Sequence, residues 1–400
     1  MEGGSGKLAC NYNGDHLATA DIKHSGKQWL ACGSNHFGQL DILENERLIR
    51  YMKKIALEGS IRCLTSSWSY VAAINGCSMQ IWGFINCQTK NIKNITVDNT
   101  IKTLACCDRY CLLLLNTGTV FKYNVQCLDD NLEEIKFQIN ESHKPKRLSI
   151  FGSSATSSSN SVLKIENIAC GNTIMVAIGM SNEVFTGTTE VHRFPKHVRT
   201  KQLVCGFEHA LLLTHNGDIY TWGNGLRGQL GLDSIGVKIK PILLEAMAGI
   251  KIICITASGW HSAAISTFGD LYTWGFNSNG QLGLRIYKND TIKEPSIYMV
   301  PQLIELTDLN CCEQKTEPCI PIKVTGGARH TIVLMNCGAV FSVGWNAYGQ
   351  LGLKNNRMYI DKFTRILKIE NCIDDVEIVC GSWNTWITMH TDSKYVHYKN

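Results

Sequence analysis

Three histidines are the residues of this sequence whose type and placement could first suggest catalysis or metal binding. His209, His261 and His330 each follow a short polar step and precede an apolar run. Imidazole nitrogens are frequent metal ligands and general bases, so three of them could build a metal site or part of a catalytic triad. All three, however, occupy the same position of a repeated string, and a recurring position defines a building unit. We therefore expect them to make structural hydrogen bonds between neighbouring units.

Some of the 18 cysteines also recur with the repeat. Four of them share one position, four residues before the anchor of a copy, where other copies have alanine or glycine: Cys106, Cys170, Cys205 and Cys380. A free cysteine packs as a small apolar residue, so this position requires a small side chain. The chain has no C-x-x-C pair, and the groups that begin at Cys106 and at Cys311 lack zinc-site spacing. We expect no metal ion.

Motifs for cofactor chemistry are also missing from the sequence. It contains no glycine-rich phosphate loop, no nucleophile elbow and no H-E-x-x-H motif. We therefore expect no cofactor and no enzymatic activity.

The repeated unit is most distinct in three strings: DIYTWGNGLRGQLGL (218–232), DLYTWGFNSNGQLGL (270–284) and AVFSVGWNAYGQLGL (339–353). An apolar run and a tight turn precede each string, as in ALLLTHNG (210–217). With the second strand at the start of the string they predict a β-hairpin. A glycine ends the second strand of each copy: Gly223, Gly275 and Gly344. A Gly-Gln-Leu turn follows, at Gln229, Gln281 and Gln350, and a fourth copy of this turn contains Gln39. We expect the glutamines, like the histidines, to be structural.

Weaker copies extend the repeat along the chain and give seven anchors in register: Ser69, Tyr110, Ile174, His209, His261, His330 and Asn384. Their intervals scatter around the ~40–50 residues typical of a propeller blade. The last copy lacks its exit turn, whereas QWLACGSNHFGQL (28–40) has the strand and the turn but no first half. Complementary half-blades at the two ends predict a closed ring, because a linear solenoid would need caps. The fold class is therefore all-β, a seven-bladed propeller closed by N- and C-terminal strands in one blade.

We expect residues 1–400 to form this single domain, with three additions. Residues 1–27 form a partly flexible N-terminal segment, 151–161 a serine-rich loop and 285–321 a longer insertion. Nothing at the N-terminus resembles an apolar export signal, and we find no membrane span. Reduced thiols then indicate the cytosol or nucleus.

The pattern G-x-x-H-(S/T), with a glycine-ended aromatic strand and G-Q-L-G, resembles the regulator of chromosome condensation repeat family. The resemblance covers nearly the whole chain and is strong across 205–353. Strings such as SGWHS (258–262) and CGSWNT (380–385) resemble a subfamily in which the propeller is essentially the whole protein. The resemblance implies a monomeric adaptor in the nucleus and cytoplasm, chromosome-associated. It further implies a JmjC-domain histone demethylase or hydroxylase, and histones or chromatin, as partners in chromosome segregation and transcriptional control.

The candidate binding residues are the variable ones just before the anchors, where the copies disagree. They are rich in tryptophan, arginine and acidic side chains: Trp68, Asp108, Arg109, Glu208, Trp260, Arg329 and Trp383. Tryptophan and arginine are enriched at binding hot spots, so we expect a protein-binding rim. Alternatively, the tryptophans fill gaps between blades.

Two other functions remain open at this point. In the family's guanine-exchange member this step faces a small GTPase, so the resemblance implies guanine-nucleotide exchange as the alternative, with 285–321 as the wedge. Here only Asp108 and Glu208 keep acidic character. The basic stretch 191–202 suggests direct nucleosome or nucleic-acid binding, but a net charge of only +5 argues against a strong phosphate footprint.

Overall fold

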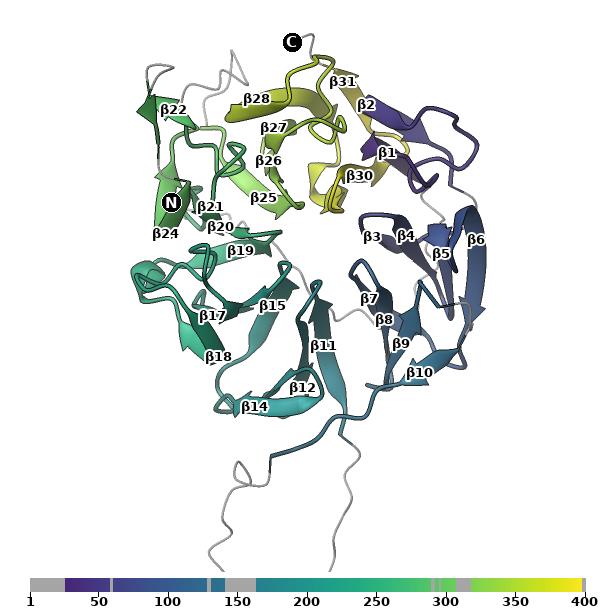
Figure 1. Cartoon of the computed structure of the whole chain (residues 1–400), viewed down its shortest axis with the longest axis vertical. Coiled ribbons are helices and arrows are strands. Elements are labelled where there is room, and N and C mark those ends of the chain that lie inside the picture. Colours follow the sequence, from purple (N-terminus) through teal and green to yellow (C-terminus); the bar gives the residue numbers. More distant parts are fainter. Residues whose placement is uncertain are drawn as a thin grey trace, which may run out of the picture.

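The computed structural model describes residues 26–57, 60–127, 131–140, 163–288, 292–294, 296–306 and 318–397. Seven sheets stand around a central axis like the blades of a propeller (Figure 1). The predicted all-β, seven-bladed fold is therefore confirmed. The predicted N-terminal segment, apart from residues 26–27, and the serine-rich loop lie outside the described residues. Helical structure in the described part is limited to two short 3-10 turns, η2 (Glu245–Met247) and η3 (Ile373–Asp375).

In blades 1 to 3, the order of the strands from the inside to the outside of the ring is the same as their order in the sequence. Blade 1 contains β3 (Cys63–Ser66), β4 (Tyr70–Asn75), β5 (Ser78–Ile85) and β6 (Gln88–Thr96). Blade 2 contains β7 (Ile101–Cys106), β8 (Tyr110–Leu115), β9 (Val120–Asn124) and β10 (Leu132–Glu134). Blade 3 contains β11 (Ile165–Cys170), β12 (Met175–Gly179), β13 (Glu183–Thr186) and β14 (Thr189–Arg193).

Blades 4 to 6 contain the three clearest copies of the repeat. Blade 4 contains β15 (Thr200–Cys205), β16 (His209–Thr214), β17 (Ile219–Asn224) and β18 (Val237–Leu243). Blade 5 contains β19 (Ile252–Ala257), β20 (His261–Ser266), β21 (Leu271–Phe276) and β24 (Ile297–Ile304). Blade 6 contains β25 (Pro321–Gly326), β26 (His330–Met335), β27 (Ala339–Trp345), β28 (Tyr359–Glu370) and β31 (Lys394–His397).

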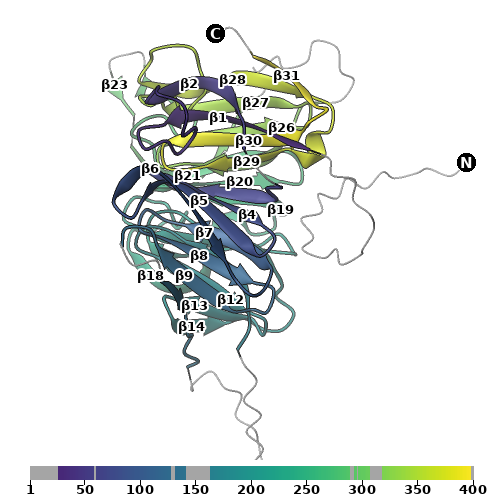
Figure 2. The ribbon, with the colours of Figure 1, turned by 90° about the vertical axis from the view of Figure 1, so that its right-hand side faces the viewer.

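Blade 7 closes the ring with strands from both ends of the chain, as predicted (Figures 1 and 2). The C-terminal part supplies β29 (Glu377–Cys380) and β30 (Asn384–His390), and the N-terminal part supplies β1 (Lys27–Ser34) and β2 (Leu48–Ile55). Gly33 pairs with Asn384 just as Gly223 pairs with His209 in blade 4. The strand β31 then leaves this blade and pairs with β28, so the end of the chain also joins blades 6 and 7.

The predicted insertion 285–321 is divided by a strand of the propeller. Its residues include β24, the outer strand of blade 5, which pairs with β21. Before β24 lies the small hairpin of β22 (Tyr287–Lys288) and β23 (Ile292–Lys293). Residues 307–317 of the predicted insertion lie outside the described residues. No helix in the described ranges is long and apolar enough to cross a membrane.

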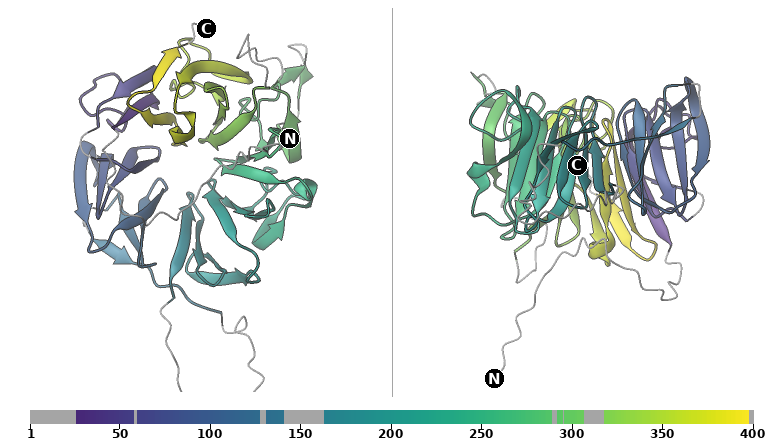
Figure 3. Two further views of the ribbon diagram at one scale, coloured as in Figure 1. Left: turned by 180° about the vertical axis from the view of Figure 1, so that it is seen from behind. Right: turned by 90° about the horizontal axis from the view of Figure 1, so that it is seen from below.

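The core of the ring is a series of apolar layers between successive blades. The second strands of the blades are covered on both faces, which is why runs such as HALLLT are buried at every position. The outer strand β18, in contrast, alternates and is mostly exposed. Between blades 4 and 5, for example, Leu211 and Leu213 pack with Ile255 and Trp274. In the edge-on views of Figures 2 and 3 the strands cross the thickness of the ring, so every blade sends loops to two faces.

Candidate protein-interaction site

The three repeat histidines lie between blades and not in a common site. His209 Nε2 is 2.8 Å from the Ser262 hydroxyl of the next blade, which donates to the Gln229 carbonyl. The hydroxyl therefore accepts from the histidine, so Nε2 carries the proton. His261 and His330 make the equivalent bonds to Thr331 (2.9 Å) and Thr385 (3.1 Å). Each histidine thus shares one hydrogen-bonded junction with an exit-turn glutamine, namely Gln229, Gln281 or Gln350.

These histidines make the stability of the protein depend on pH. Burial lowers the pKa of each of the three to about 3, below the ~6.5 of an unfolded histidine. Between these two pKa values the histidines are protonated in the unfolded chain but not in the folded chain. The free energy of unfolding therefore falls as the pH falls. The contribution of the three neutral histidines to the free energy of unfolding is complete above pH ~6.5 and is lost progressively toward pH ~3. We expect each histidine to lower the free energy of unfolding by about 1.4 kcal/mol per pH unit below pH ~6.

Urea unfolding between pH 7 and pH 5 measures this dependence. The variant His261→Gln, which keeps a donor for Thr331 but does not titrate, should lose about 2 kcal/mol less stability than the wild type between pH 7 and pH 5. A slope that does not change in this variant would mean that His261 is not the titrating group.

The blade 1 anchor assigned from the sequence is wrong by one residue. Tyr70, and not Ser69, pairs with Gly83 in the way that His209 pairs with Gly223. The β4–β5 hairpin is shorter, closing at Asn75↔Ser78, so counting back from Gly83 overshoots. The Tyr70 hydroxyl lies 2.8 Å from the carbonyl oxygens of Cys107 and Tyr110, and so takes the bridging role of the histidine.

The predicted rim residues all lie in the loops between the first and second strands, on one face of the ring, but they differ in how they are held. Asp108 is tied to both neighbouring blades, because it accepts from Ser67 (3.1 Å) and Asn172 (2.8 Å). Glu208 accepts from Asn224 of its own blade at 3.0 Å. Arg109 is exposed. Neither Asp108 nor Arg109 joins the aromatic residues of the rim.

A second set of residues on this face, which the sequence prediction missed, contacts the predicted ones. The residue before each Gly-Gln turn touches the rim residue of the next blade. The four pairs are Phe37–Trp68 (ring centroids 5.4 Å apart), Arg227–Trp260 (Cζ to centroid 4.3 Å), Asn279–Arg329 (hydrogen bond, 3.2 Å) and Tyr348–Trp383 (5.4 Å). We call these four pairs the rim arc. The rim arc extends over five successive blades, from blade 4 through blades 5, 6 and 7 to blade 1.

The exit-turn glutamines fix the first member of each pair. The backbone N–H groups of Phe37, Arg227, Asn279 and Tyr348 donate to the side-chain oxygen of the glutamine two residues later, at 2.8–3.1 Å. The residue between them is glycine with positive φ, for example Gly228 at 75°. The most regular turn of the repeat therefore presents a residue that differs in all four copies.

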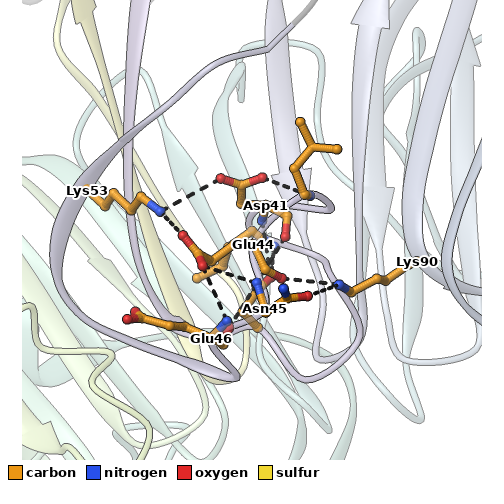
Figure 4. Close-up of polar contacts among 9 residues, drawn as sticks. Asp41, Glu44, Asn45, Glu46, Lys53 and Lys90 are labelled. Atoms are coloured by element: carbon orange, nitrogen blue, oxygen red, sulfur yellow. Dashed lines mark hydrogen bonds and ion pairs between the residues drawn. The ribbon is translucent and has the colours of Figure 1, made fainter.

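The loop that carries Phe37 is braced by a network of charged and polar groups between β1 and β2 (Figure 4). Lys53 pairs with Asp41 and Glu44 of this loop. From blade 1, Lys90 donates to the Glu44 carbonyl at 3.2 Å and lies 3.4 Å from the Asn45 side-chain oxygen. The backbone of Lys90 also donates to the Phe37 carbonyl at 2.9 Å. Phe37 is thus held across the blade 7–blade 1 junction, beside Trp68.

Trp260 has the densest surroundings in the rim arc. Its ring contacts Phe207 (5.4 Å) and Phe276 (6.3 Å) edge to face. Arg227 of blade 4 covers the ring, and the Cζ atom of Arg329, from blade 6, lies 6.0 Å from the ring centroid. The ring remains partly exposed. Both earlier interpretations therefore apply to Trp260: it fills the gap between blades and leaves part of its surface to solvent. Trp68 is more open, at 44% exposure.

Comparison with known proteins identifies the repeat. Two models of the regulator of chromosome condensation (RCC1) repeat match residues 216–265 and 269–334, and residues 201–229 and 252–281. The human protein named RCC1 domain-containing protein 1 is 31% identical over 215 residues, which cover 48% of this chain and 56% of that protein. The Arabidopsis thaliana ultraviolet-B receptor UVR8 is 30% identical over 212 residues, covering 48% of this chain and 44% of the receptor. The chain thus spans about half the length of the curated relatives it matches.

Solved structures extend the likeness of the fold to nearly the whole chain. Human WBSCR16 superposes with a TM-score of 0.69 at 15% identity, covering 91% of this chain and 100% of that one. Prp20p from Saccharomyces cerevisiae superposes with a TM-score of 0.67 at 16% identity, covering 94% and 92%. The repeat matches and the fold lead to one conclusion: this chain is a seven-bladed β-propeller, and regulator of chromosome condensation repeats are recognised in it within residues 201–334.

Proposed function

We propose that this propeller is a non-enzymatic adaptor that binds a protein partner through the rim arc. The observation that carries the proposal is the set of four pairs on one face, each joining a variable turn residue to a variable loop residue of the next blade. Aromatic and arginine side chains held rigidly on a surface lose little entropy on binding and are typical hot-spot residues.

The charges of this face favour a protein over nucleic acid. Within the described ranges, the guanidinium groups of Arg227 and Arg329 form no ion pair, so both are available to an acidic partner. The carboxylates of Glu208 and Asp108 lie on the same face, which would repel a phosphate backbone. A mixed surface of this kind suits a protein that itself presents both charges.

The family resemblance supplies the identity of the partner within this proposal. We propose a JmjC-domain histone demethylase or hydroxylase, with action on histones or chromatin in chromosome segregation and transcriptional control, in the nucleus and cytoplasm and on chromosomes. Prp20p, which shares the fold, is described by its binding to Gsp1p and histones. That description supports proteins of this kind as the first ones to assay.

Reversing the charge of Glu208 tests the proposed face without touching the core. The purified chain and a purified JmjC-domain oxygenase, or histones, are titrated by calorimetry. Glu208→Arg should raise the Kd at least ~10-fold, about 1.4 kcal/mol, because it places a cation against the partner and removes the bond to Asn224. The matched control is Glu133→Arg, on the exposed outer strand of blade 2, which should leave the Kd unchanged. Equal effects of the two reversals would place the binding surface elsewhere.

Guanine-nucleotide exchange is the alternative function, and a nucleotide-release assay with small GTPases distinguishes it from adaptor function. An adaptor should not accelerate nucleotide release from small GTPases when it is substoichiometric. Rapid release from one GTPase at such a ratio would replace the adaptor proposal by an exchange factor. Steep salt dependence of DNA binding would instead favour direct nucleosome binding.

A further inference from the structure

Five thiols gather beside the inner strands of blades 2 to 4: Cys106, Cys107, Cys111, Cys170 and Cys205. The Sγ atoms of Cys106 and Cys111 are 3.3 Å apart. Cys111 is fully buried, and its Sγ also lies 3.6 Å from Met79 Sδ. Cys106, in contrast, is half-buried and lines a central cavity of about 380 Å³. Cys106 is thus the more accessible residue of the pair, and Cys111 is the buried one.

The backbone places these two cysteines where a cross-strand disulfide can form. Strands β7 and β8 pair in the register Cys106↔Cys111. The adjacent pair, Cys107 and Tyr110, is the hydrogen-bonded one, because Cys107 N–H donates to the Tyr110 carbonyl at 3.0 Å. Cys106 and Cys111 therefore form a non-hydrogen-bonded pair, with Cα atoms about 4.5 Å apart. Disulfides span Cα distances of about 4.4–6.8 Å, so side-chain rotation alone can join the sulfurs.

We propose that Cys106 and Cys111 are a peroxide-sensitive oxidation site that closes to a disulfide. The Cys106 thiolate attacks one oxygen of hydrogen peroxide, the O–O bond breaks, and hydroxide leaves as water after protonation, giving a sulfenic acid. The Cys111 thiol then attacks that sulfur while its proton passes to the departing oxygen, the S–O bond breaks, and a second water leaves. Two thiols lose two electrons, and one peroxide is reduced to two waters.

Burial of Cys111 favours the disulfide over further oxidation. A sulfenic acid that meets a thiol at once condenses with it, whereas one that stays exposed to peroxide proceeds to sulfinic acid. The competing neighbour is Cys107, because its hydrogen bond with Cys170 lowers the pKa of the Cys107 thiol to about 7. Cys107 is only 4% exposed, however, whereas Cys106 faces the cavity more openly. Access therefore selects Cys106 as the first thiol to react.

The disulfide would brace one loop of the interaction face. Residues 107–110 connect Cys106 to Cys111, and this loop carries Asp108 and Arg109. A disulfide between the strand ends restricts the motion of this loop and leaves the hydrogen bonds of Asp108 with Ser67 and Asn172 intact. The oxidation site rests on the geometry of β7 and β8 and does not depend on what the rim arc binds.

Mass spectrometry of the whole chain tests the proposal, because the sequence places a tryptic site between the two cysteines. Trypsin cleaves after Lys102, Arg109 and Lys122, so Cys106 lies in peptide 103–109 and Cys111 in peptide 110–122. The reduced protein is treated with hydrogen peroxide, blocked with N-ethylmaleimide and digested. We expect the two peptides to appear linked by a disulfide, and the link to disappear on reduction with dithiothreitol.

Single substitutions identify the sulfurs that react. Cys106→Ser and Cys111→Ser should each abolish the link between the two peptides, whereas Cys107→Ser should leave it intact. Persistence of the link in Cys106→Ser would overturn the proposal in favour of Cys107. A link from peptide 103–109 to the peptide that contains Cys170, or no disulfide beyond that of a protein unfolded in urea, would also overturn it. Circular dichroism of each variant shows that the propeller is folded.

Discussion

Replacing Trp260 with alanine is expected to weaken binding of the protein partner at least ~30-fold, which corresponds to about 2 kcal/mol. The side chain lies in the middle of the rim arc, between Arg227 and Arg329. Its removal deletes an aromatic anchor and also releases both arginines from the positions that the ring gives them. Calorimetry or surface plasmon resonance with the partner of the previous titrations measures the change in Kd.

The stability of the same variant separates a binding residue from a core residue. Trp260 is partly exposed, so we expect its loss to lower the free energy of unfolding by only about 1–2 kcal/mol. Phe268→Ala is the matched control, because Phe268 belongs to the same blade, is 79% exposed and lies in the hairpin at the opposite end of β20. If Trp260→Ala unfolds the protein, the tryptophan is core. If it binds the partner normally, the rim arc is not the binding surface.

The fold was predictable from the sequence because its determinants are local and recur. Each hairpin is encoded by an apolar run, a turn and a glycine-ended strand, and a set of such copies leaves few arrangements. Ring closure was predictable for the same reason, since 28–40 and the last copy are two halves of one unit, and Gly33 does pair with Asn384. The one-residue error at Ser69 arose where a blade departs from the common hairpin length.

The site was only half predictable, because each pair of the rim arc joins residues from two different blades. The loop residues were found from their variability, but Phe37, Arg227, Asn279 and Tyr348 were not, although they precede the most regular turn of the repeat. Their signal is also variability at a fixed repeat position. The sequence does not show which turn residue contacts which loop residue, because these contacts depend on how one blade packs on the next.

Packing between blades also decides the largest effect that we expect on stability. Trp274→Ala should lower the free energy of unfolding by about 4–5 kcal/mol, because it empties a large site in the layer between blades 4 and 5. Trp274 is fully buried, and its Nε1 donates to the Gln229 carbonyl at 3.0 Å. Urea unfolding followed by far-ultraviolet circular dichroism measures the loss.

Two phenylalanine substitutions separate the hydrogen bond from the volume of the ring. Trp274→Phe removes the donor to Gln229, whereas Trp386→Phe removes an indole N–H that has no partner within the described part of the chain. Both tryptophans are buried to the same degree. The Trp274 variant should therefore lose about 0.5–1.5 kcal/mol more than the Trp386 variant. Equal losses would mean that the exit turn is held by its Ser262 bond and by packing, and that the recurring tryptophan stabilises the junction by its volume alone.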